Sequence, residues 1–308
     1  MAANKATKAP PGAAQGAVPD TFNPMLLHSE KALKPREGWS YEPKFDGMRA
    51  IALIANKECK LLSRNGRDIT KTFPELSTLL AKQKGELVLD AEIIVVGDDG
   101  RPDFEGLQSR WLLSKEKDVQ AAQMRSPSAM YVFDVMHSNN YILTKCKLTD
   151  RKEVLLDRLT EHANIKAVGS FHDGPALLEA CREQKLEGVV AKRNDSLYLE
   201  GARSKDWIRV KFTETDKFVV VGYKKEDGFL VKRFADDDAS IVGAVQYGFS
   251  DANYKRLVSA LKPSNKQLKT KRDDVLWFAP TVWIEVEFMQ WTKYGKLRFP
   301  VFKKILTV

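Results

Sequence analysis

The chain has 308 residues, of which 43% are hydrophobic and 30% charged, and it carries a formal net charge of +9. This describes an ordinary soluble globular protein, long enough for two domains that each bury a core. The basic charge balance favours a polyanionic partner, so we expect nucleic acid first and an acidic membrane surface second.

Cysteine usage and hydrophobic runs exclude several classes. Cys59, Cys146 and Cys181 are far apart and odd in number, which fits neither a disulfide framework nor a C-x-x-C zinc site. No apolar run approaches the length of a membrane span. The start of the chain is rich in Ala, Pro and Gly without the apolar core of a signal peptide. We therefore predict a disordered tail over residues 1–21 and a cytoplasmic protein.

A short motif, Lys-Phe-Asp-Gly-Met-Arg at residues 44–49, carries the strongest chemical signal. A lysine can attack a phosphate when its neighbours lower its pKa or take its proton, and Asp46 could orient the amine. Gly47 lets the backbone approach a bulky ligand, and Arg49 offers a planar fork of donors for phosphate or ribose oxygens. The alternative is a solvated turn between two strands.

The elements after this motif indicate a sheet with helices. Residues 51–54 and 60–63 read as strands, with an Asn-Gly turn at residues 65–66, and residues 73–82 read as a helix. Residues 86–96 form a run too apolar and β-branched for anything but a central strand, interrupted by Asp90 and Glu92. Their spacing places both carboxylates on one face, which we expect to look into a ligand or metal site. The alternative is an edge strand with its acids in water.

Further elements follow up to residue 212. We expect helices over residues 104–113, 150–162 and 175–184, with Asp150 as the N-cap of the second, and strands over residues 130–137 and 189–193. Residues 205–212 alternate so that Arg209 and Lys211 share a face opposite Ile208 and Val210. Two cations on a mostly buried strand need an anion, and a phosphate would supply it.

From residue 216 the sequence pattern changes to that of short strands separated by glycine-containing turns. We predict strands over residues 218–223, 229–233, 241–247 and 283–288, with a helix over residues 252–261. This pattern suggests a small closed barrel of the OB type, a common nucleic-acid platform. Residues 262–272 contain five cations and no acid, which suits a loop along a phosphate backbone and equally a solvated loop.

Together these segments carry a family resemblance. They resemble, in order and spacing, the nucleotidyltransferase motifs of ATP-dependent DNA ligases, over about residues 24–303, and the segment 291–303 resembles the bacterial end-joining branch. The matching motifs are at residues 44–49, 90–92, 133–134, 187–192 and 207–211. The resemblance implies an α+β fold: an ATP-grasp-like adenylation domain of antiparallel sheets and helices over residues 22–213, then an OB-fold barrel over residues 214–308.

The resemblance also implies a nucleotide site. Lys44 would form a covalent lysyl–AMP. The backbone around Glu42 and Pro43 would read the adenine, with Phe133 stacked on one face of the ring and Val190 on the other.

Phosphate and metal contacts are implied in the same way. Arg49 and Arg64 would hold ribose and phosphate, Glu92 the ribose hydroxyl, and Glu187 with Glu92 the catalytic Mg²⁺ (or Mn²⁺). The α-phosphate would be neutralised by Lys192, Arg209 and Lys211.

The second domain would assist the first step. Arg298 and Lys303 are candidates to grip the departing pyrophosphate, so the two domains would close for that step and then reopen. Two positions depart from the family: Arg209 stands where lysine is common, and the C-terminus lacks an arginine that many relatives have.

The implied function is an ATP-dependent DNA ligase, a monomer that seals nicked duplex DNA in DNA repair. The alternatives are an RNA ligase, an mRNA-capping guanylyltransferase, and a non-catalytic OB protein that binds single strands in a basic groove. The short chain and the lack of a four-cysteine zinc module disfavour an NAD⁺-dependent ligase.

Overall fold

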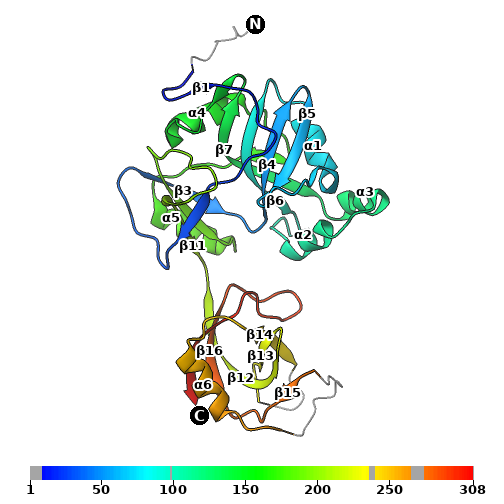
Figure 1. Cartoon of the computed structure of the whole chain (residues 1–308), viewed down its shortest axis with the longest axis vertical. Helices are drawn as coiled ribbons and strands as arrows, with labels where there is room; N and C mark the ends of the chain where they lie inside the picture. The colour runs from blue at the N-terminus through cyan, green and yellow to red at the C-terminus, as the bar shows by residue number, and fades with distance from the viewer. Residues whose placement is uncertain (1–8, 98, 236–239, 265–273, 308) are drawn as a thin grey trace. The chain divides into compact units, whose positions relative to one another are not determined.

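The structure is a computed structural model that describes residues 9–97, 99–235, 240–264 and 274–307. Two compact units make up the chain, Met1–Val210 and Lys211–Val308. The change falls inside strand β11 (Arg203–Lys211), shortly before the expected boundary at residues 213–214. Each unit is described by itself below (Figure 1).

The larger sheet of the first unit is mostly antiparallel. Its order is β1-β8-β7-β6-β4-β5, with β9 parallel to β7. Its strands are β1 (Ala14–Gln15), β4 (Met48–Ala55), β5 (Glu58–Ser63), β6 (Leu87–Val95), β7 (Ser128–Ser138), β8 (Tyr141–Ile142) and β9 (Ile165–Ala167). Figure 1 shows β4, β6 and β7 side by side in the middle of this sheet.

A smaller sheet supplies the other wall of the site. It has the order β2-β11-β10-β3, with β2 (Leu26–Ser29), β3 (Trp39–Lys44) and β10 (Gly188–Arg193) beside β11. β3 lies at its edge, and across that edge Tyr41 exchanges two backbone hydrogen bonds of 2.8 Å with Phe171.

The larger sheet is buried on both faces, which explains its unbroken apolar runs. On β4, Ala50, Ala52 and Ile54 pack into one core, and Ile51 and Leu53 pack into another. The second core also contains Met25, Tyr198 and Trp207, which come from around the smaller sheet. The face of β6 that carries Asp90 and Glu92 therefore looks toward the smaller sheet, and the site lies between the sheets.

Short helices cover the sheets. They are η1 (Thr70–Thr72), α1 (Pro74–Leu80), α2 (Phe104–Trp111), α3 (Glu116–Arg125), α4 (Leu148–Arg158) and α5 (Gly174–Glu183). The side chains of Asp103 and Asp173 cap α2 and α5 by accepting an amide hydrogen bond. The cap predicted at Asp150 is wrong: α4 begins two residues earlier, and Asp150 lies in its first turn. There a carboxylate still interacts favourably with the helix dipole.

The predicted N-terminal tail is also wrong for the residues that the structure describes. β1 pairs with β8, and the carbonyl of Gly16 lies 2.9 Å from Nε2 of the buried His137. Gly12, at φ +87°, lies so close to the carbonyl of Lys145 that a Cβ would be 2.4 Å from its oxygen. An Ala/Pro/Gly-rich segment can thus dock by backbone pairing where its composition offers few side chains.

The second unit is a small barrel. Its strand order is β14-β13-β12-β16-β17, with β15 beside β12. These are β12 (Glu214–Lys224), β13 (Gly228–Lys232), β14 (Ile241–Val245), β15 (Leu276–Trp277), β16 (Trp283–Phe288) and β17 (Val301–Thr307). The amide of Phe302 donates to the carbonyl of Tyr247 at 2.8 Å, which joins the chain just after β14 to β17 and closes the barrel.

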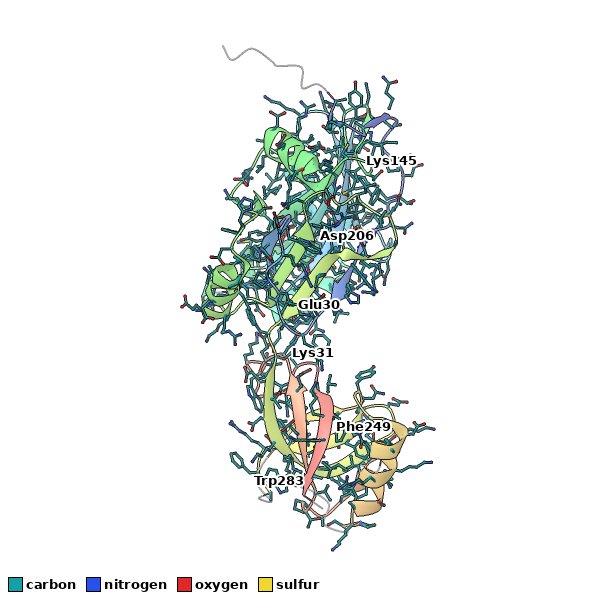
Figure 2. The ribbon with its side chains drawn as sticks, turned by 90° about the vertical axis from the view of Figure 1, so that its left-hand side faces the viewer. Glu30, Lys31, Lys145, Asp206, Phe249 and Trp283 are labelled. Carbon is teal, nitrogen blue, oxygen red and sulfur yellow. The ribbon has the colours of Figure 1, made fainter. Side chains whose placement is uncertain are left out.

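Aromatic side chains fill this barrel. Phe249 stacks on Phe302 with ring centroids 4.3 Å apart and lies beside α6 (Asp251–Ala260) (Figure 2). Phe218 and Phe288 are buried in the same core, together with Leu257 of α6.

Part of the predicted basic loop at residues 262–272 lies outside the described residues, from residue 265 onward. Within the described ranges, no helix is long and apolar enough to cross a membrane.

Candidate active site

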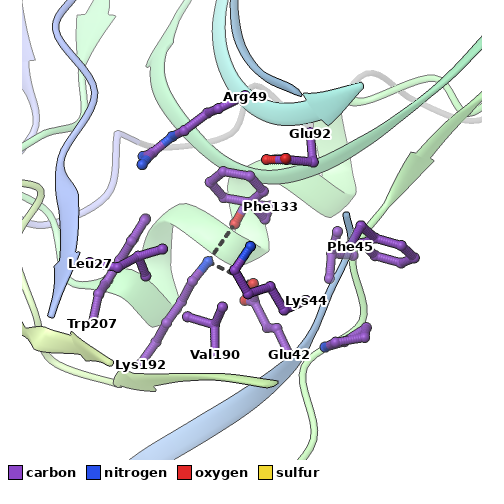
Figure 3. Close-up of a pocket in the computed structure, with 12 residues that line it drawn as sticks. Leu27, Glu42, Lys44, Phe45, Arg49, Glu92, Phe133, Val190, Lys192 and Trp207 are labelled. Atoms are coloured by element: carbon purple, nitrogen blue, oxygen red, sulfur yellow. Dashed lines mark hydrogen bonds and ion pairs between the residues drawn. The ribbon is translucent and has the colours of Figure 1, made fainter. Parts of the chain in front are cut away.

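A pocket lies between the two sheets of the first unit, at the end of β3 where the lysine motif stands (Figure 3). It receives side chains from β2, β3, β4, β6, β7, β10 and β11 and from the loop after β9. Its lining residues are Leu27, Glu42, Pro43, Lys44, Phe45, Arg49, Glu92, Phe133, Val168, Val190, Lys192 and Trp207.

The turn between β3 and β4 helps to place Lys44, Phe45 and Arg49 of the motif in this pocket. β3 ends at Lys44 and β4 begins at Met48. A Cβ added to Gly47 would lie 2.2 Å from the carbonyl oxygen of Ile93 and 3.0 Å from the Glu92 side chain. Glycine is therefore required here, because β6 passes too close for a side chain.

Lys44 is ion-paired with Glu187, which stands between α5 and β10. The Lys44 side chain is 15% exposed and that of Glu187 is 5% exposed, so the amine is sheltered but reachable from the pocket. The amide of Glu187 donates to the Lys44 carbonyl at 3.1 Å, which fixes the two backbones together.

Glu92 lies beside this pair. Burial raises its pKa to about 7, Lys44 and Arg49 oppose the rise, and the carboxylates of Glu187 and Asp46 add to it. The charges of Glu187 and Asp46 thus act on Glu92 close to the amine. Carboxylates with a pKa perturbed in this way are typical of functional sites.

Arg49 is held by a buried carboxylate. Its Nε and Nη2 donate to Asp90 at 2.9 and 2.6 Å. Burial would lower the pKa of Arg49, but the Asp90 carboxylate raises it overall. Asp90 is fully buried and also accepts from the Tyr198 hydroxyl at 2.6 Å. Of the two carboxylates that we expected to face a ligand, Glu92 lines the pocket, whereas Asp90 is bound to Arg49.

Glu42 presents its side chain to the pocket. Its backbone is paired with Val190 in the ladder between β3 and β10, while the neighbouring Tyr41 pairs toward Phe171. The N–H and C=O of Glu42 thus point to β10. The backbone groups of Glu42 are thus used in the sheet while its side chain faces the pocket, and the predicted reading of adenine by the backbone around Glu42 and Pro43 stays a prediction.

The Glu42 carboxylate is paired with two ammonium groups. Lys152 of α4 lies 2.6 Å from Oε1 and Lys192 of β10 lies 2.6 Å from Oε2. Burial lowers the pKa of Lys192 to about 8, although Glu42 opposes the change. The Lys192 ammonium also lies 4.1 Å from the centroid of the Trp207 ring and 4.6 Å from that of Phe133.

Phe133 and Val190 both line the pocket, from β7 and β10 respectively. Phe133 meets Trp207 edge to face, with ring centroids 6.2 Å apart, and the Arg49 guanidinium lies 5.4 Å from its centroid. The aromatic ring and the valine methyls offer apolar surface for a flat base.

A second hollow of about 610 Å³ adjoins the pocket and shares Leu27, Lys44, Arg49 and Glu92 with it. It is lined by Lys44, Arg49, Arg64, Arg67, Arg203 and Arg209. Burial and the neighbouring guanidinium groups of Arg49, Arg203 and Arg209 lower the pKa of Arg64. Arg209 is oriented by Ser29, to which its Nε donates at 2.7 Å. Such a concentration of cations favours a polyanion.

Three predicted residues belong to the second unit. The Lys211 ammonium lies 3.8 Å from the Met289 sulfur. The Arg298 guanidinium lies 5.1 Å from the centroid of the Phe299 ring, and Lys303 is paired with Glu287 at 2.8 Å.

Glu92 of the pocket and Glu187 beside Lys44 are a carboxylate pair of the kind that suits a divalent cation. Among the described residues no group of three or more His, Cys, Asp or Glu could hold a metal by itself. Mg²⁺ is usually held by one or two carboxylates together with substrate phosphates, and Glu92 and Glu187 supply such a pair next to Lys44.

Several residues of this site escaped the sequence reasoning. Trp207 lies within the strand predicted over residues 205–212 and Arg203 lies just before it, so strand periodicity could have indicated them. Lys152 and Tyr198 gave no such signal, since one lies in an ordinary amphipathic helix and the other in a loop.

Two sheets that enclose a lysine, paired carboxylates and an arginine-lined hollow, in a chain that ends in a small barrel, are the architecture of a nucleotidyltransferase. The chain belongs to the ATP-dependent DNA ligase family. The family model described as "ATP dependent DNA ligase domain" matches residues 24–211, and "ATP dependent DNA ligase C terminal region" matches residues 224–307. The resemblance seen in the sequence and the prediction of a ligase enzyme are confirmed.

Similar proteins include a prophage-derived DNA ligase-like protein, LigB, of Bacillus subtilis (strain 168). It is 31% identical over 283 residues, which span 91% of this chain and 97% of that protein. The multifunctional non-homologous end joining protein LigD of Pseudomonas aeruginosa is 31% identical over 291 residues, 87% of this chain but 33% of LigD. The chain thus spans nearly all of LigB and about a third of that LigD.

Solved structures share the fold. The ligase domain of Mycobacterium tuberculosis LigD has a TM-score of 0.55 and 24% identity, and covers 92% of this chain and 95% of its own. A Lig E DNA ligase has a TM-score of 0.63 and 18% identity, with coverage of 92% and 99%. The predicted fold class, an adenylation domain followed by an OB-fold barrel, is confirmed.

Proposed function

We propose that this chain seals nicks with a 5′-phosphate and an adjacent 3′-hydroxyl in duplex DNA, in DNA repair, through a lysyl–AMP at Lys44. The observation that carries the proposal is the position of Lys44, which lines both the pocket for a base and the hollow lined by arginines. An amine at that junction can reach the α-phosphate of a nucleotide whose base fills the pocket. Relatives named as a DNA ligase and a DNA ligase-like protein support the substrate class.

Three transfers make up the reaction. The Lys44 amine, after loss of its proton, attacks the α-phosphorus of ATP; a P–N bond forms, the P–O bond to the β-phosphate breaks, and pyrophosphate leaves. An oxygen of the nick's 5′-phosphate then attacks the same phosphorus, so that the P–N bond breaks and the amine regains a proton. The 3′-hydroxyl finally attacks the 5′-phosphate, loses its proton and releases AMP.

The pocket would hold the nucleoside. Phe133 and Val190 would lie on the two faces of the adenine, and Glu42 would read its edge through the side chain. Arg49, fixed by Asp90, would contact the ribose or the phosphates, and Glu92 the ribose hydroxyl.

The arginine-lined hollow would take phosphate groups. Arg64, Arg203 and Arg209 line it beside Lys44, so it would hold the nick's 5′-phosphate close to the adenylated amine. Lys192 and Lys211 would add positive charge for the α-phosphate. Because Lys192 is ion-paired with Glu42, Lys192 would contribute less to the α-phosphate than Lys211.

Glu92 and Glu187 would hold Mg²⁺ (or Mn²⁺), which supplies charge neutralisation for the phosphates when it is bound. The Lys44–Glu187 pair also gives the amine a neighbouring carboxylate that can orient it before attack. Asp46, whose charge acts on Glu92, would help to place these groups.

Arg298 and Lys303 of the barrel would bind the departing pyrophosphate. The partner would be nicked duplex DNA, and the protein would act as a monomer in the cytoplasm. The net charge of +9 supports a polyanionic partner.

Intact-mass measurement after incubation with ATP and Mg²⁺ tests the first step. The wild type should gain one adenylyl group, and Lys44→Arg should gain none, because an arginine is not a nucleophile at neutral pH. Lys166→Arg is the matched control, since Lys166 is an exposed lysine paired with Glu161 away from the pocket.

Sealing assays then decide the substrate. Nicked DNA duplex and nicked RNA duplex would each be incubated with ATP or with GTP. We expect sealed product only from nicked DNA with ATP. A lysyl–GMP adduct would point to a capping-type guanylyltransferase, and sealing confined to RNA would point to an RNA ligase.

A further inference from the structure

Each oxygen of the Glu42 carboxylate is contacted by a different lysine. Lys152 Nζ lies 2.6 Å from Oε1, and the Ser170 hydroxyl donates to the same oxygen at 3.3 Å. Lys192 Nζ lies 2.6 Å from Oε2 (Figure 3). Lys152 itself is fixed by a second contact, a hydrogen bond of 3.2 Å to the carbonyl of Val168. A helix, a loop and a strand therefore meet at one side chain.

Such pairing holds a buried carboxylate in one orientation and compensates its charge. The Glu42 side chain is 3% exposed, and a buried charge without partners would be costly. An ionised carboxylate accepts hydrogen bonds and donates none. It offers about four acceptor positions, so the three donors named above leave capacity for an N–H group of a bound molecule.

The base of a nucleotide is the molecule that this acceptor would meet. Glu42 lines the same pocket as Phe133 and Val190, the two sides of the slot for a flat ring. A purine with an amino group at position 6 presents N–H donors there, whereas guanine presents a carbonyl oxygen. A fixed anionic acceptor attracts the first and repels the second.

We propose that Lys152 is a positioning residue for base selection: by holding the Glu42 carboxylate in one orientation from α4, it makes the pocket prefer a purine with a 6-amino group. The inference rests on the proposed function for its ligand class. It adds a determinant that lies outside the strands of the pocket and touches neither the base nor the phosphates.

Lys192 alone would not replace Lys152. It binds the other oxygen, and its ammonium is shared with the carbonyl of Phe133 at 3.4 Å. Without Lys152, the Oε1 side of the carboxylate keeps only the Ser170 hydroxyl, a more distant and neutral donor, so the group can rotate. A carboxylate that rotates away from the base no longer opposes the guanine carbonyl, and the preference against guanine would weaken.

Equilibrium binding of nucleoside monophosphates tests this without chemistry at Lys44. Dissociation constants would be measured by calorimetry for AMP, purine riboside monophosphate (which lacks the 6-amino group) and GMP. The wild type should bind AMP more tightly than both. In Lys152→Met the preference should shrink about 10-fold or more, as expected for a hydrogen bond to a charged acceptor, with the loss mainly in AMP affinity.

Two further variants separate positioning from a general structural role. Lys152→Arg keeps a cation and should restore most of the preference. Lys166→Met removes a lysine from an exposed pair and should leave it unchanged. Thermal unfolding of each variant shows that it is folded.

The proposal is overturned if Lys152→Met weakens AMP, GMP and the purine analogue equally, or if the wild type shows no preference for the 6-amino group. Failure of the proposed function is seen separately, as absence of the lysyl–AMP adduct in a protein that still binds AMP selectively. A folded wild type that binds none of the three nucleotides would refute both.

Discussion

Tyr198→Phe is the most informative single-atom change at this site. The Tyr198 hydroxyl donates to Asp90 at 2.6 Å and accepts from the Met25 amide at 3.0 Å, and Arg49 Nη2 lies 3.4 Å from it. Burial and the Asp90 charge raise the pKa of Tyr198 well above its usual value, so it remains a neutral donor. Phenylalanine keeps the ring, which packs against Trp207 and Phe22, and removes that one oxygen.

The cost follows from the lost bonds. A hydrogen bond to a charged acceptor contributes about 1.5–3 kcal/mol, and a buried amide left without a partner costs about 1–3 kcal/mol. Because the groups share one network, the two terms do not add fully, and we expect a loss of about 3 kcal/mol. That is a large share of the stability of a typical domain, about 5–15 kcal/mol.

A second tyrosine provides the matched control. The Tyr41 hydroxyl accepts from the Arg36 amide at 2.9 Å, and Tyr41 is equally buried. Tyr41→Phe should therefore cost about 1 kcal/mol, the value of a neutral hydrogen bond.

Urea unfolding of the two variants at pH 7 compares these costs, and the KM for ATP in adenylation reports on Arg49. Tyr198→Phe should raise that KM because Asp90 then orients Arg49 without help, whereas Tyr41→Phe should not. Equal losses of stability in the two variants, with an unchanged KM, would show that the Asp90–Tyr198 bond does not support the site.

Three further predictions concern charge. Lys192 has a pKa of about 8 and is charged below that pH, so adenylation should decline at more alkaline pH, by up to tenfold per unit, and Lys192→Arg should remove this decline. Chelation of divalent ions should abolish adenylation, and Glu187→Gln should slow it about 100-fold while gel-shift binding of nicked DNA persists. Arg151 is fully buried and donates twice to Asp134 at 2.8 Å, so Arg151→Met should cost about 3–5 kcal/mol in urea unfolding. Arg151→Met/Asp134→Leu should recover part of that loss, and no recovery would mean that the unpaired carboxylate is not its cause.

Much of the fold and of the candidate site could be predicted from the sequence, because several of the site residues lie on strands with a regular pattern. Lys44 stands at the end of one strand and Glu92 in the middle of another, and a period of two places alternate residues on one face. The family resemblance rests on the same local strings, and the family match confirms it. The prediction of a second domain came from the change in sequence pattern near residue 216.

The tertiary structure decided which neighbours those residues have. Lys152 meets Glu42, and Tyr198 meets Asp90, across more than a hundred residues of chain. Local periodicity cannot predict such contacts, since they form only when sheets and helices pack together. For the same reason the sequence could place Asp90 and Glu92 on one face but could not tell that Asp90 would be taken by Arg49. The pattern of residues determined the faces, and the packing of those faces determined which charged groups remain for a ligand.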